Sequence, residues 1–319
     1  MTHQSISTYI PELDEAYDTT ATSATEWVFA EKASDHHRQC LAAEASQWLR
    51  QGLAHLRQGQ YTPALALLQQ SLQSYRSLVD QEREARILLI LATLYYRVAD
   101  YLWATDYGRQ CLKVAQVLQH QELTQRACEH LGNSYRHLGD LQNALTYMTQ
   151  SLQVAKRLED SHAEMRSLNN LAMIYRAKGL ARQAATLYEA SLLMADSLKE
   201  SLVVLQVLQN LGNTYQSLQA YPQAIACYER FLSLSQSSNI SSIDNHVIRR
   251  TLTHLINASL ATRDYSRAIV HLRHHIDIAH KYGDNRSEDA LFRQLDSCYS
   301  ALRRQKQKEA AKQPPSTSF

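Results

Sequence analysis

The stretch HLGNSYRHLGDLQNALTYMTQSL (130–152) has two close relatives in this sequence, NNLAMIYRAKGLARQAATLYEASL (169–192) and NLGNTYQSLQAYPQAIACYERFL (210–232). The three copies align at a spacing of forty residues, and the same spacing continues toward the N-terminus. A fixed period of this length indicates a repeat architecture in which each copy is one supersecondary unit. Three columns carry the period: Ala64, Ala104, Ala144, Ala184 and Ala224; Tyr95, Tyr135, Tyr175 and Tyr215; and Leu72, Leu112, Leu152, Leu192 and Leu232.

A sixth copy is displaced by four residues. Its alanine and its aliphatic residue stand at Ala268 and Ile276, and the Ser-rich stretch QSSNISSIDN (236–245) accommodates the insertion. The first and the last copy also depart from the pattern, because His55 and Ser259 take the place of the tyrosine. Degenerate end copies are typical of a repeat array, whose terminal units must face water.

Within each copy the apolar residues keep a helical spacing. Leu131 and Tyr135 lie four apart on one face of a first helix, and Ala144 and Met148 do the same on a second helix. The turn between them, HLGDLQ (137–142), carries a glycine that suits the left-handed conformation at a helix C-terminus. Each copy is therefore predicted to be a helical hairpin, and the chain an all-α, right-handed solenoid of about six hairpins.

The composition agrees with this fold and disfavours several alternatives. The 319 residues include only 8 Gly and 5 Pro, which disfavours a strand-and-turn architecture. Five cysteines without a C-x-x-C pair predict neither a disulfide framework nor a zinc site. No signal-peptide pattern and no long apolar run are present, so we expect a cytoplasmic protein without membrane insertion. The net charge of +2 favours neither nucleic acid nor a membrane surface.

The order L-G/A-x-x-Y, G, A, Y, L in these copies resembles the tetratricopeptide repeat. The period of forty, instead of thirty-four, is similar to a subclass with longer helices that includes Pins-type adaptors, kinesin light chains and Rap-type peptide receptors. The resemblance covers about residues 41–284. It implies that the first helix of each hairpin lines a concave side, where asparagines hold a ligand peptide.

The patterns divide the chain into four segments. Residues 1–40 do not match the repeat and are predicted as a polar segment, partly disordered or with a short helix; a frayed terminus and a packing or autoinhibitory role both stay open. Residues 41–284 form the six-repeat solenoid. Residues 285–310 read as one amphipathic helix that caps the stack, and residues 311–319 as a disordered tail.

One polar stripe of each first helix should face the concave side, because positions i, i+4, i+7 and i+11 share a face. Across the twenty-four such positions of the six copies there is no Asp, Glu or Lys, although a solvated face normally mixes both charges. Asparagine amides can pair with a peptide backbone, and arginine forks recognise carboxylates. The predicted peptide-binding groove comprises Arg86, Arg126, His130, Asn133, Arg136, Arg166, Asn170, Arg176, Asn210, Asn213, Arg250, His254 and Asn257.

These features predict an interaction scaffold, an adaptor or assembly factor that binds an extended, acidic segment of a partner protein. A peptide-sensing receptor is the alternative. Nucleic-acid binding through the arginines is a third hypothesis, disfavoured by only nine lysines and a near-neutral charge. Because every amphipathic surface helix carries a polar stripe, a solvated inner face with the binding surface elsewhere stays open. The partner and the oligomeric state are not encoded in any recognisable pattern.

No motif for catalysis or for a cofactor is present. The sequence lacks a glycine-rich phosphate loop, a G-x-S-x-G elbow and an H-E-x-x-H helix. Carboxylates such as Glu84, Glu122 and Glu164 are expected at helix N-termini, where negative charge is favoured. His271 and His275 lie four apart, but no third metal ligand is evident, so an exposed histidine cluster is expected. We therefore expect no enzyme, no cofactor and no metal.

Overall fold

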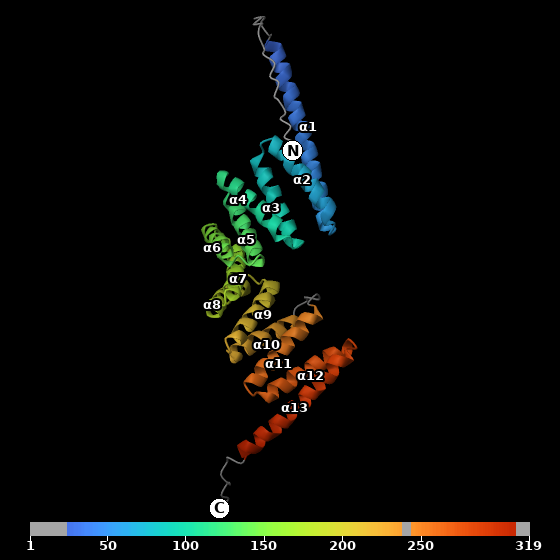
Figure 1. Ribbon diagram of the computed structural model, residues 1–319, viewed down its shortest axis with the longest axis vertical. Coiled ribbons are helices and arrows are strands. Elements are labelled where there is room, and N and C mark those ends of the chain that lie inside the picture. The colour runs from blue at the N-terminus through green and yellow to red at the C-terminus, as the bar shows by residue number, and fades with distance from the viewer. Residues whose placement is uncertain (1–23, 238–243, 311–319) are drawn as a thin grey trace, which may run out of the picture. The chain divides into compact units, whose positions relative to one another are not determined.

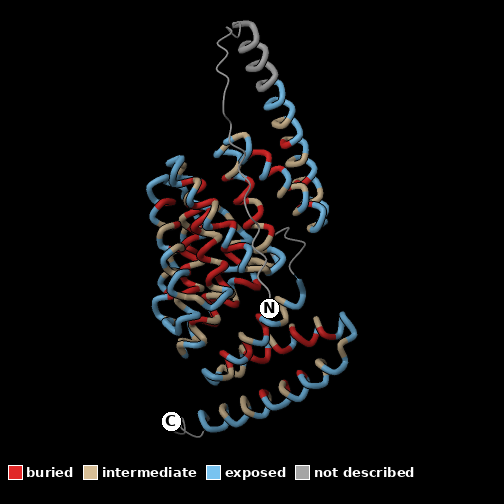
Figure 2. The backbone as a smooth tube through the Cα atoms, turned by 45° about the horizontal axis from the view of Figure 1, so that its top comes forward, coloured by how far each residue is buried: buried red, intermediate tan, exposed pale blue. Residues whose placement is uncertain are grey.

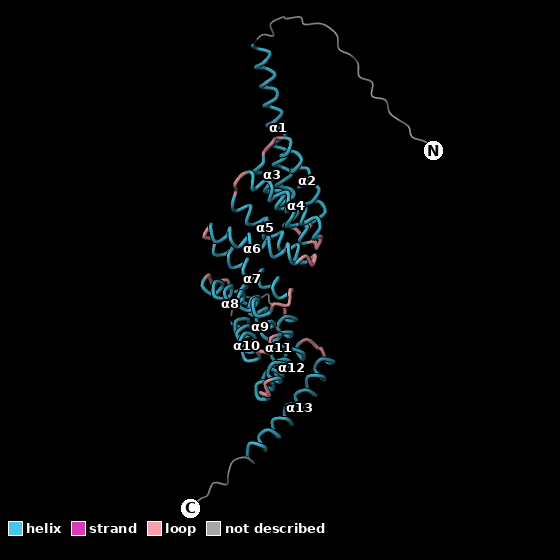
Figure 3. The backbone as a smooth tube through the Cα atoms, turned by 60° about the vertical axis from the view of Figure 1, so that its left-hand side comes forward, coloured by secondary structure: helices cyan, strands magenta, loops and turns pink. Residues whose placement is uncertain are grey.

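The computed structural model describes residues 24–237 and 244–310, and all its regular elements in these ranges are α-helices (Figures 1 and 3). The predicted tail and most of the predicted insertion lie outside these ranges. The prediction of an all-α solenoid of helical hairpins is confirmed. The described helices are α1 (Ala24–Arg57), α2 (Tyr61–Ser77), α3 (Gln81–Arg97), α4 (Tyr101–Val117), α5 (Gln121–His137), α6 (Leu141–Arg157), α7 (Ser161–Ala177), α8 (Ala181–Ser197), α9 (Ser201–Ser217), α10 (Tyr221–Ser237), α11 (Asn245–Ala261), α12 (Tyr265–Lys281) and α13 (Asn285–Ala310).

Equal helix lengths produce the forty-residue period. From α2 to α12 every helix has 17 residues. The short turns contain one residue with positive φ, which ends each helix in the left-handed conformation. Glycine takes this position at Gly139, as the sequence predicted, and also at Gly59, Gly179 and, before α13, Gly283. Other residues occupy it elsewhere: Val79, Ala99, Gln119, Glu159, Lys199, Gln219 and Arg263.

Acidic side chains mark the helix starts. Asp100, Asp140, Asp160 and Asp264 each accept a hydrogen bond from the backbone N–H three residues later. Such caps satisfy N–H groups that have no partner within the helix. The first turns also hold the acids that the sequence placed there, Glu84, Glu122 and Glu164.

The chain divides into two compact units, residues 1–80 and 81–319. In the first unit α1 packs along α2 through small polar residues. Ser71 Oγ donates a hydrogen bond to the carbonyl oxygen of Ala45 (2.8 Å), and the hydroxyls of Ser46 and Tyr75 lie 2.7 Å apart. Short side chains let two helices approach closely while their hydroxyls stay hydrogen-bonded.

The first helix begins well before the predicted start of the repeats. It runs without interruption from Ala24 to Arg57, so the predicted division at residue 40 falls inside a helix. The reason is local, because residues 24–51 contain neither Pro nor Gly to end the helix. Residues 1–23 and the side chains of residues 24–35 lie outside the described part of the chain.

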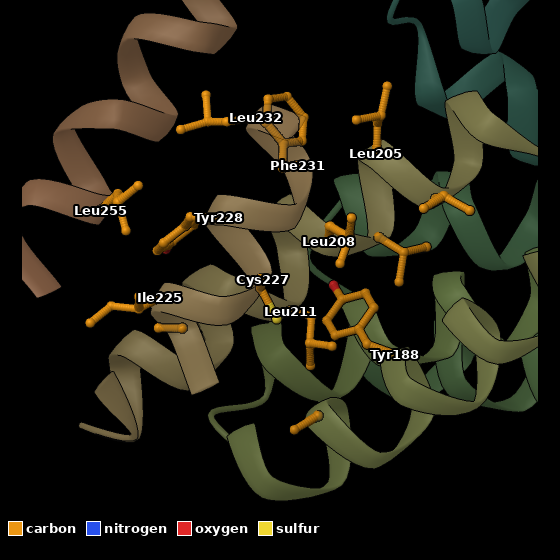
Figure 4. Packing of buried hydrophobic residues seen from close by; sticks show 14 of the residues in the cluster. Tyr188, Leu205, Leu208, Leu211, Ile225, Cys227, Tyr228, Phe231, Leu232 and Leu255 are labelled. Carbon is orange, nitrogen blue, oxygen red and sulfur yellow. The ribbon is translucent and has the colours of Figure 1, made fainter. Parts of the chain in front are cut away.

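In the second unit the hairpins pack in series from α3 to α12, and α13 packs on α12. Buried residues lie where consecutive helices face one another (Figure 2). One cluster of buried hydrophobic residues runs from α7 to α11 and includes Tyr188, Leu211, Tyr228 and Leu255 (Figure 4), and a second runs from α11 to α13. Burial of one such large side chain contributes about 1.5–3 kcal/mol, so the packing between hairpins stabilises the fold.

Glycine allows the closest approach within two hairpins. A Cβ atom added to Gly132 would lie 2.8 Å from Met148 Cε, and one added to Gly212 would lie 2.6 Å from Tyr228 Cε1. Both distances are too short for a carbon–carbon contact. The glycine in the L-G-N motif therefore serves the packing of the first helix on the second.

Candidate functional site

One side of the second unit is formed by the first helices of the hairpins. Helix α3 contacts α5, α5 contacts α7 and α9 contacts α11, whereas no two second helices in the described ranges make a comparable contact. Helices that approach one another in this way lie on the inner side of a curved array. We call the solvent-facing side of α3, α5, α7, α9 and α11 the inner face.

A cavity of about 440 Å³ opens on the inner face between α3, α5 and α7. It brings together four of the predicted groove residues, namely Arg126, His130, Asn133 and Arg166. Its other lining residues are Tyr96, Glu122, Gln125, Glu129 and Asp160.

The acidic residues in this cavity correct the sequence interpretation. The stripe positions themselves hold no acid, but the inner face around them does, because Glu122, Glu129 and Asp160 line the same cavity as Arg126. Glu129 was missed since it directly precedes His130, and one residue along a helix rotates the side chain by about 100°. It lies beside the stripe that the periodicity selected.

An ion pair links two hairpins across this cavity. Arg166 Nε lies 3.3 Å from Glu129 Oε1, and the side chain of Glu129 is only 16% exposed. A partly buried carboxylate needs such a partner, because burial removes part of its hydration. Arg166 is therefore already engaged by the protein itself.

His130 is held in the same cavity by a hydrogen bond from its ring. Thr93 Oγ1 donates to the carbonyl oxygen of Leu89 (2.8 Å) and lies 3.0 Å from His130 Nε2. Because the threonine proton is used on the carbonyl, we assign the Nε2 proton of His130 as the donor to Thr93. Burial lowers the pKa of His130, and Arg126 and Arg166 act in the same direction while Glu129 opposes them. The ring is neutral at pH 7.

A second histidine closes the α3–α5 edge of the inner face. His137 Nε2 accepts a hydrogen bond from an Arg136 guanidinium nitrogen at 2.8 Å and lies 3.0 Å from Tyr96 Oη. The ring of His137 stacks on Tyr101 with 4.4 Å between the ring centroids. Burial and the neighbouring Arg136 lower the pKa of His137. The two histidines and Glu129 of α5 are thus paired within the protein, whereas Arg126 and Asn133 on the same helix make no side-chain hydrogen bond or ion pair to a described residue.

The inner face of α7, α9 and α11 is different. The side-chain amides of Asn170, Asn210 and Asn257 make no hydrogen bond to any described residue. The amide of Asn213 is oriented by the second helix of its hairpin, because the Tyr228 hydroxyl donates to its Oδ1 at 2.8 Å. His254 stacks on the ring of Tyr228, with 5.8 Å between the centroids. These amides can donate to and accept from an added polypeptide backbone.

The predicted arginines fall into two groups. Arg86 is paired with Glu82 on its own helix at 2.9 Å, and Arg136 is bonded to His137. Arg126, Arg176 and Arg250 are at least partly exposed and form no ion pair with a residue in the described ranges. These three guanidinium groups are available to a negatively charged ligand.

The predicted exposed histidine cluster on α12 is wrong. His275 is only 7% exposed, and its Nδ1 has no hydrogen-bond partner in the described part of the chain. Burial lowers the pKa of His275 to about 4. His271 Nε2 lies 3.5 Å from Glu229 Oε1. Within residues 24–237 and 244–310 no group of three or more His, Cys, Asp or Glu side chains is arranged to hold a metal ion.

Helical hairpins stacked in series along a shared inner face define a helical-repeat scaffold. Models of the tetratricopeptide repeat match residues 52–82, 113–197 and 165–237. The matched residues are tetratricopeptide repeats, as the sequence motifs predicted. This fold supports a protein-interaction or peptide-binding scaffold and is typical of non-enzymatic proteins. No curated protein sequence matches the chain significantly.

Several solved structures share the fold. BtubC (BKLC) from P. vanneervenii is 21% identical, with a TM-score of 0.58 over 77% of this chain and 92% of that one. A Rap protein complexed with competence and sporulation factor is 15% identical, with a TM-score of 0.54 over 82% and 76%. TPR-like repeats of a putative kinesin light chain from Podosopora anserina are 17% identical, with a TM-score of 0.53 over 62% and 96%. At these identities the likeness concerns the fold.

None of the described helices combines the length and the apolar composition that crossing a bilayer requires.

Proposed function

We propose that this protein is a scaffold whose inner face across α7, α9 and α11 holds an extended, acidic segment of a partner protein. The observation that carries the proposal is the set of amides on these three helices, Asn170, Asn210 and Asn257, without partners among the described residues. A primary amide has the same donor and acceptor groups as a peptide unit, so it can hold a backbone whatever its sequence.

The spacing of the helices suits an extended ligand. Packed helices lie about 8–10 Å apart, and an extended chain advances about 3.3 Å per residue. Consecutive first helices, which pack mainly on the second helix between them, would therefore meet backbone groups at least about three residues apart. Side chains between these points can contact neighbouring residues of the inner face.

The unpaired arginines supply the preference for acidic residues. Arg176 and Arg250 belong to the same inner face as the amides and have no ion pair within the described ranges. A guanidinium group binds a carboxylate through two parallel hydrogen bonds. Acidic side chains of the partner would then set the register of a backbone that the amides hold without sequence preference. Among proteins of this fold, the Rap protein above was crystallised with competence and sporulation factor.

A copurification experiment tests the proposal. The full chain is compared with Asn170→Ala plus Asn210→Ala, and with Gln153→Ala plus Gln183→Ala, which removes two exposed amides from the second helices α6 and α8. Loss of two backbone hydrogen bonds at about 1 kcal/mol each predicts that recovery of the partner falls about tenfold or more only in the asparagine variant. Circular dichroism verifies that both variants fold.

The identity of the recovered molecule separates the alternatives. A protein lost only from the asparagine variant supports the scaffold, and a short peptide lost in the same way supports a peptide-sensing receptor. Nucleic acid that dissociates steeply with added salt points to binding through the arginines. If both variants recover the same molecules as the unmodified chain, the amides of the inner face do not form the binding site.

A further inference from the structure

A second cavity, of about 430 Å³, lies where α11, α12 and α13 meet. Every ionisable side chain in its lining is basic or neutral, and none is acidic. The lining residues are His246, Arg249, Arg250 and Thr253 from α11, His275 from α12, and Ser287, Ala290 and Leu291 from α13.

The walls of this cavity are fixed by hydrogen bonds around the start of α13. An Arg249 guanidinium nitrogen lies 2.5 Å from Asp284 Oδ2 and donates to Ser287 Oγ at 3.2 Å. The backbone N–H of Ser287 in turn donates to Asp284 Oδ1 at 3.2 Å. The hydrogen bonds from Ser287 and Arg249 hold the pKa of Asp284 at about 2. Arg249 is therefore neutralised by Asp284, whereas the charge of Arg250 is not compensated within the described ranges.

Helix α12 contributes to this cavity a buried polar side chain, His275, that lacks a hydrogen-bond partner at one ring nitrogen among the described residues. His275 lines the cavity, is more than nine-tenths buried, and has no hydrogen-bond partner at Nδ1 among the described residues. Buried polar atoms are normally paired, so an unpaired one at a cavity calls for an explanation. A bound group that supplies further polar contacts to this region would provide one.

We propose that this cavity is an oxyanion site, which takes a carboxylate or phosphate group between Arg250 and the N-terminal turn of α13. Three features combine in its favour: the guanidinium of Arg250 without an ion pair in the described ranges, the first turn of α13, where Asp284 offsets only part of the positive end of the helix dipole, and a buried imidazole in the wall. The charge pattern of the lining excludes a cation as the preferred ligand. The site shares Arg250 with the proposed inner-face groove but does not depend on the amides.

The test changes Ser287, because an acidic side chain there opposes the positive potential of the cavity without disturbing the fold. A carboxylate three residues after the helix cap is favourable in a first turn, so Ser287→Asp should fold while repelling an anion. Ser287→Asn is the neutral control of similar size. Binding of inorganic phosphate to the full chain is measured by calorimetry or by chemical-shift titration. We expect phosphate to bind about tenfold or more weakly to Ser287→Asp than to Ser287→Asn, since the two side chains are similar in size and only the first adds a negative charge.

A second variant and a second ligand identify the source of the anion. Arg250→Gln should weaken phosphate about tenfold, whereas Arg293→Gln, on the exposed side of α13, should not. An acidic peptide that displaces phosphate, with the same dependence on Ser287, assigns the site to the carboxylates of a polypeptide. Phosphate binding that such a peptide does not displace assigns it to free or esterified phosphate. Both results support the site, and an adventitious ion would bind all variants equally.

The proposal is overturned if wild-type protein binds neither phosphate nor the acidic peptide, or if Ser287→Asp and Arg250→Gln bind them as well as the controls. Asn170→Ala plus Asn210→Ala should leave the phosphate affinity unchanged. That variant therefore separates a failure of the amide groove from a failure of the oxyanion site.

Discussion

The inner faces of α5 and α9 occupy the same positions of the repeat but differ in how their polar side chains are paired. On α5, His130 is bonded to Thr93 of α3 and Glu129 to Arg166 of α7. On α9, the position of His130 is taken by Asn210, whose amide has no partner in the described ranges. Polar groups that satisfy one another stabilise the array, whereas groups left open are available to a ligand. The paired side chains of α5 thus stabilise the array, and the proposed function places ligand binding on the open amide of α9.

The same two regions differ in the turns behind them. The turns after α5 and α7 use Gly139 and Gly179 for the left-handed residue, with φ of 81° and 78°. The turns after α9 and α11 place Gln219 and Arg263 there, both with φ of 59°. The left-handed conformation costs a residue with a Cβ about 1–2 kcal/mol of free energy. Of the three helices with open amides, α9 and α11 are thus followed by strained turns, whereas α7 is followed by Gly179.

The largest expected effect is a loss of stability in acid, because α5 and α12 each bury one imidazole in a different way. His130 has its hydrogen bond to Thr93, whereas His275, against α11, is unpaired at Nδ1. Burial lowers the pKa of His275 from 6.5 to about 4. A depressed pKa contributes stability that is fully present above pH 6.5 and is lost as the pH falls toward 4. The loss amounts to about 3 kcal/mol by pH 4 and below.

Urea unfolding at pH 7 and pH 4 measures this effect. His275→Phe should be less sensitive to acid than the wild type, and phenylalanine already occupies the equivalent position in the preceding hairpin, at Phe231. His246→Gln changes an exposed histidine and should keep the wild-type response. Equal acid sensitivity in all three proteins would show that the buried imidazole is not the group that titrates.

The next largest effect is expected where α9 packs on α10. Gly212→Ala would place a Cβ 2.6 Å from Tyr228 Cε1, and Tyr228 is fully buried. Overpacking of this kind costs about 1–3 kcal/mol, and displacement of Tyr228 would also release the amide of Asn213. We expect a lower midpoint of thermal unfolding together with weaker partner binding.

A second substitution checks the cause of that effect. Tyr228→Leu in the Gly212→Ala background should recover part of the stability, because the pair Ile256 and Leu272 fills the same two positions in the next hairpin. It should not recover binding, since leucine cannot donate to Asn213. Recovery of both properties would mean that the Tyr228 hydroxyl does not position the amide.

Much of this architecture was predictable from the sequence. The forty-residue period and the Leu131–Tyr135 spacing determine helical hairpins, because they follow from backbone geometry that repeats in every copy. The pairing of inner-face groups was not predictable, since Glu129 reaches Arg166 and His130 reaches Thr93 across hairpins. Such contacts depend on which side chain lies next to the stripe, and a period of 3.6 residues does not resolve neighbours on adjacent helices.

The burial of His275 was missed for a related reason. Two histidines four residues apart look alike in the sequence, but His275 is buried in the wall of the cavity between α11, α12 and α13. The repeat held a signal for this burial, because the same position in earlier copies is taken by Ser151, Ser191 and Phe231, which are all buried. Column-by-column comparison would therefore have found it.

The strained turns predict a smaller effect of opposite sign in the two regions. Gln219→Gly and Arg263→Gly should each stabilise the second unit by about 0.5–1 kcal/mol, because the relief of left-handed strain exceeds the added flexibility of the unfolded chain. Gly139→Ala and Gly179→Ala should destabilise it by about 1 kcal/mol. Thermal unfolding of the four single variants measures both. If neither Gln219→Gly nor Arg263→Gly stabilises the protein, the turns after α9 and α11 carry no strain.

The smallest effect concerns the ion pair that distinguishes α5 from α9. A double-mutant cycle with Glu129→Gln and Arg166→Gln should give a coupling of about 0.2–1 kcal/mol, because the pair is only partly buried. Glu129→Gln alone frees Arg166 and so gives α7 an available guanidinium like that of Arg250. If the arginines select acidic residues, this variant should bind an acidic partner segment a few-fold more tightly at low salt, with the gain lost at high salt. A tighter complex that persists at high salt would instead attribute the gain to the new glutamine amide and would separate the backbone-holding role of amides from the charge selection of arginines.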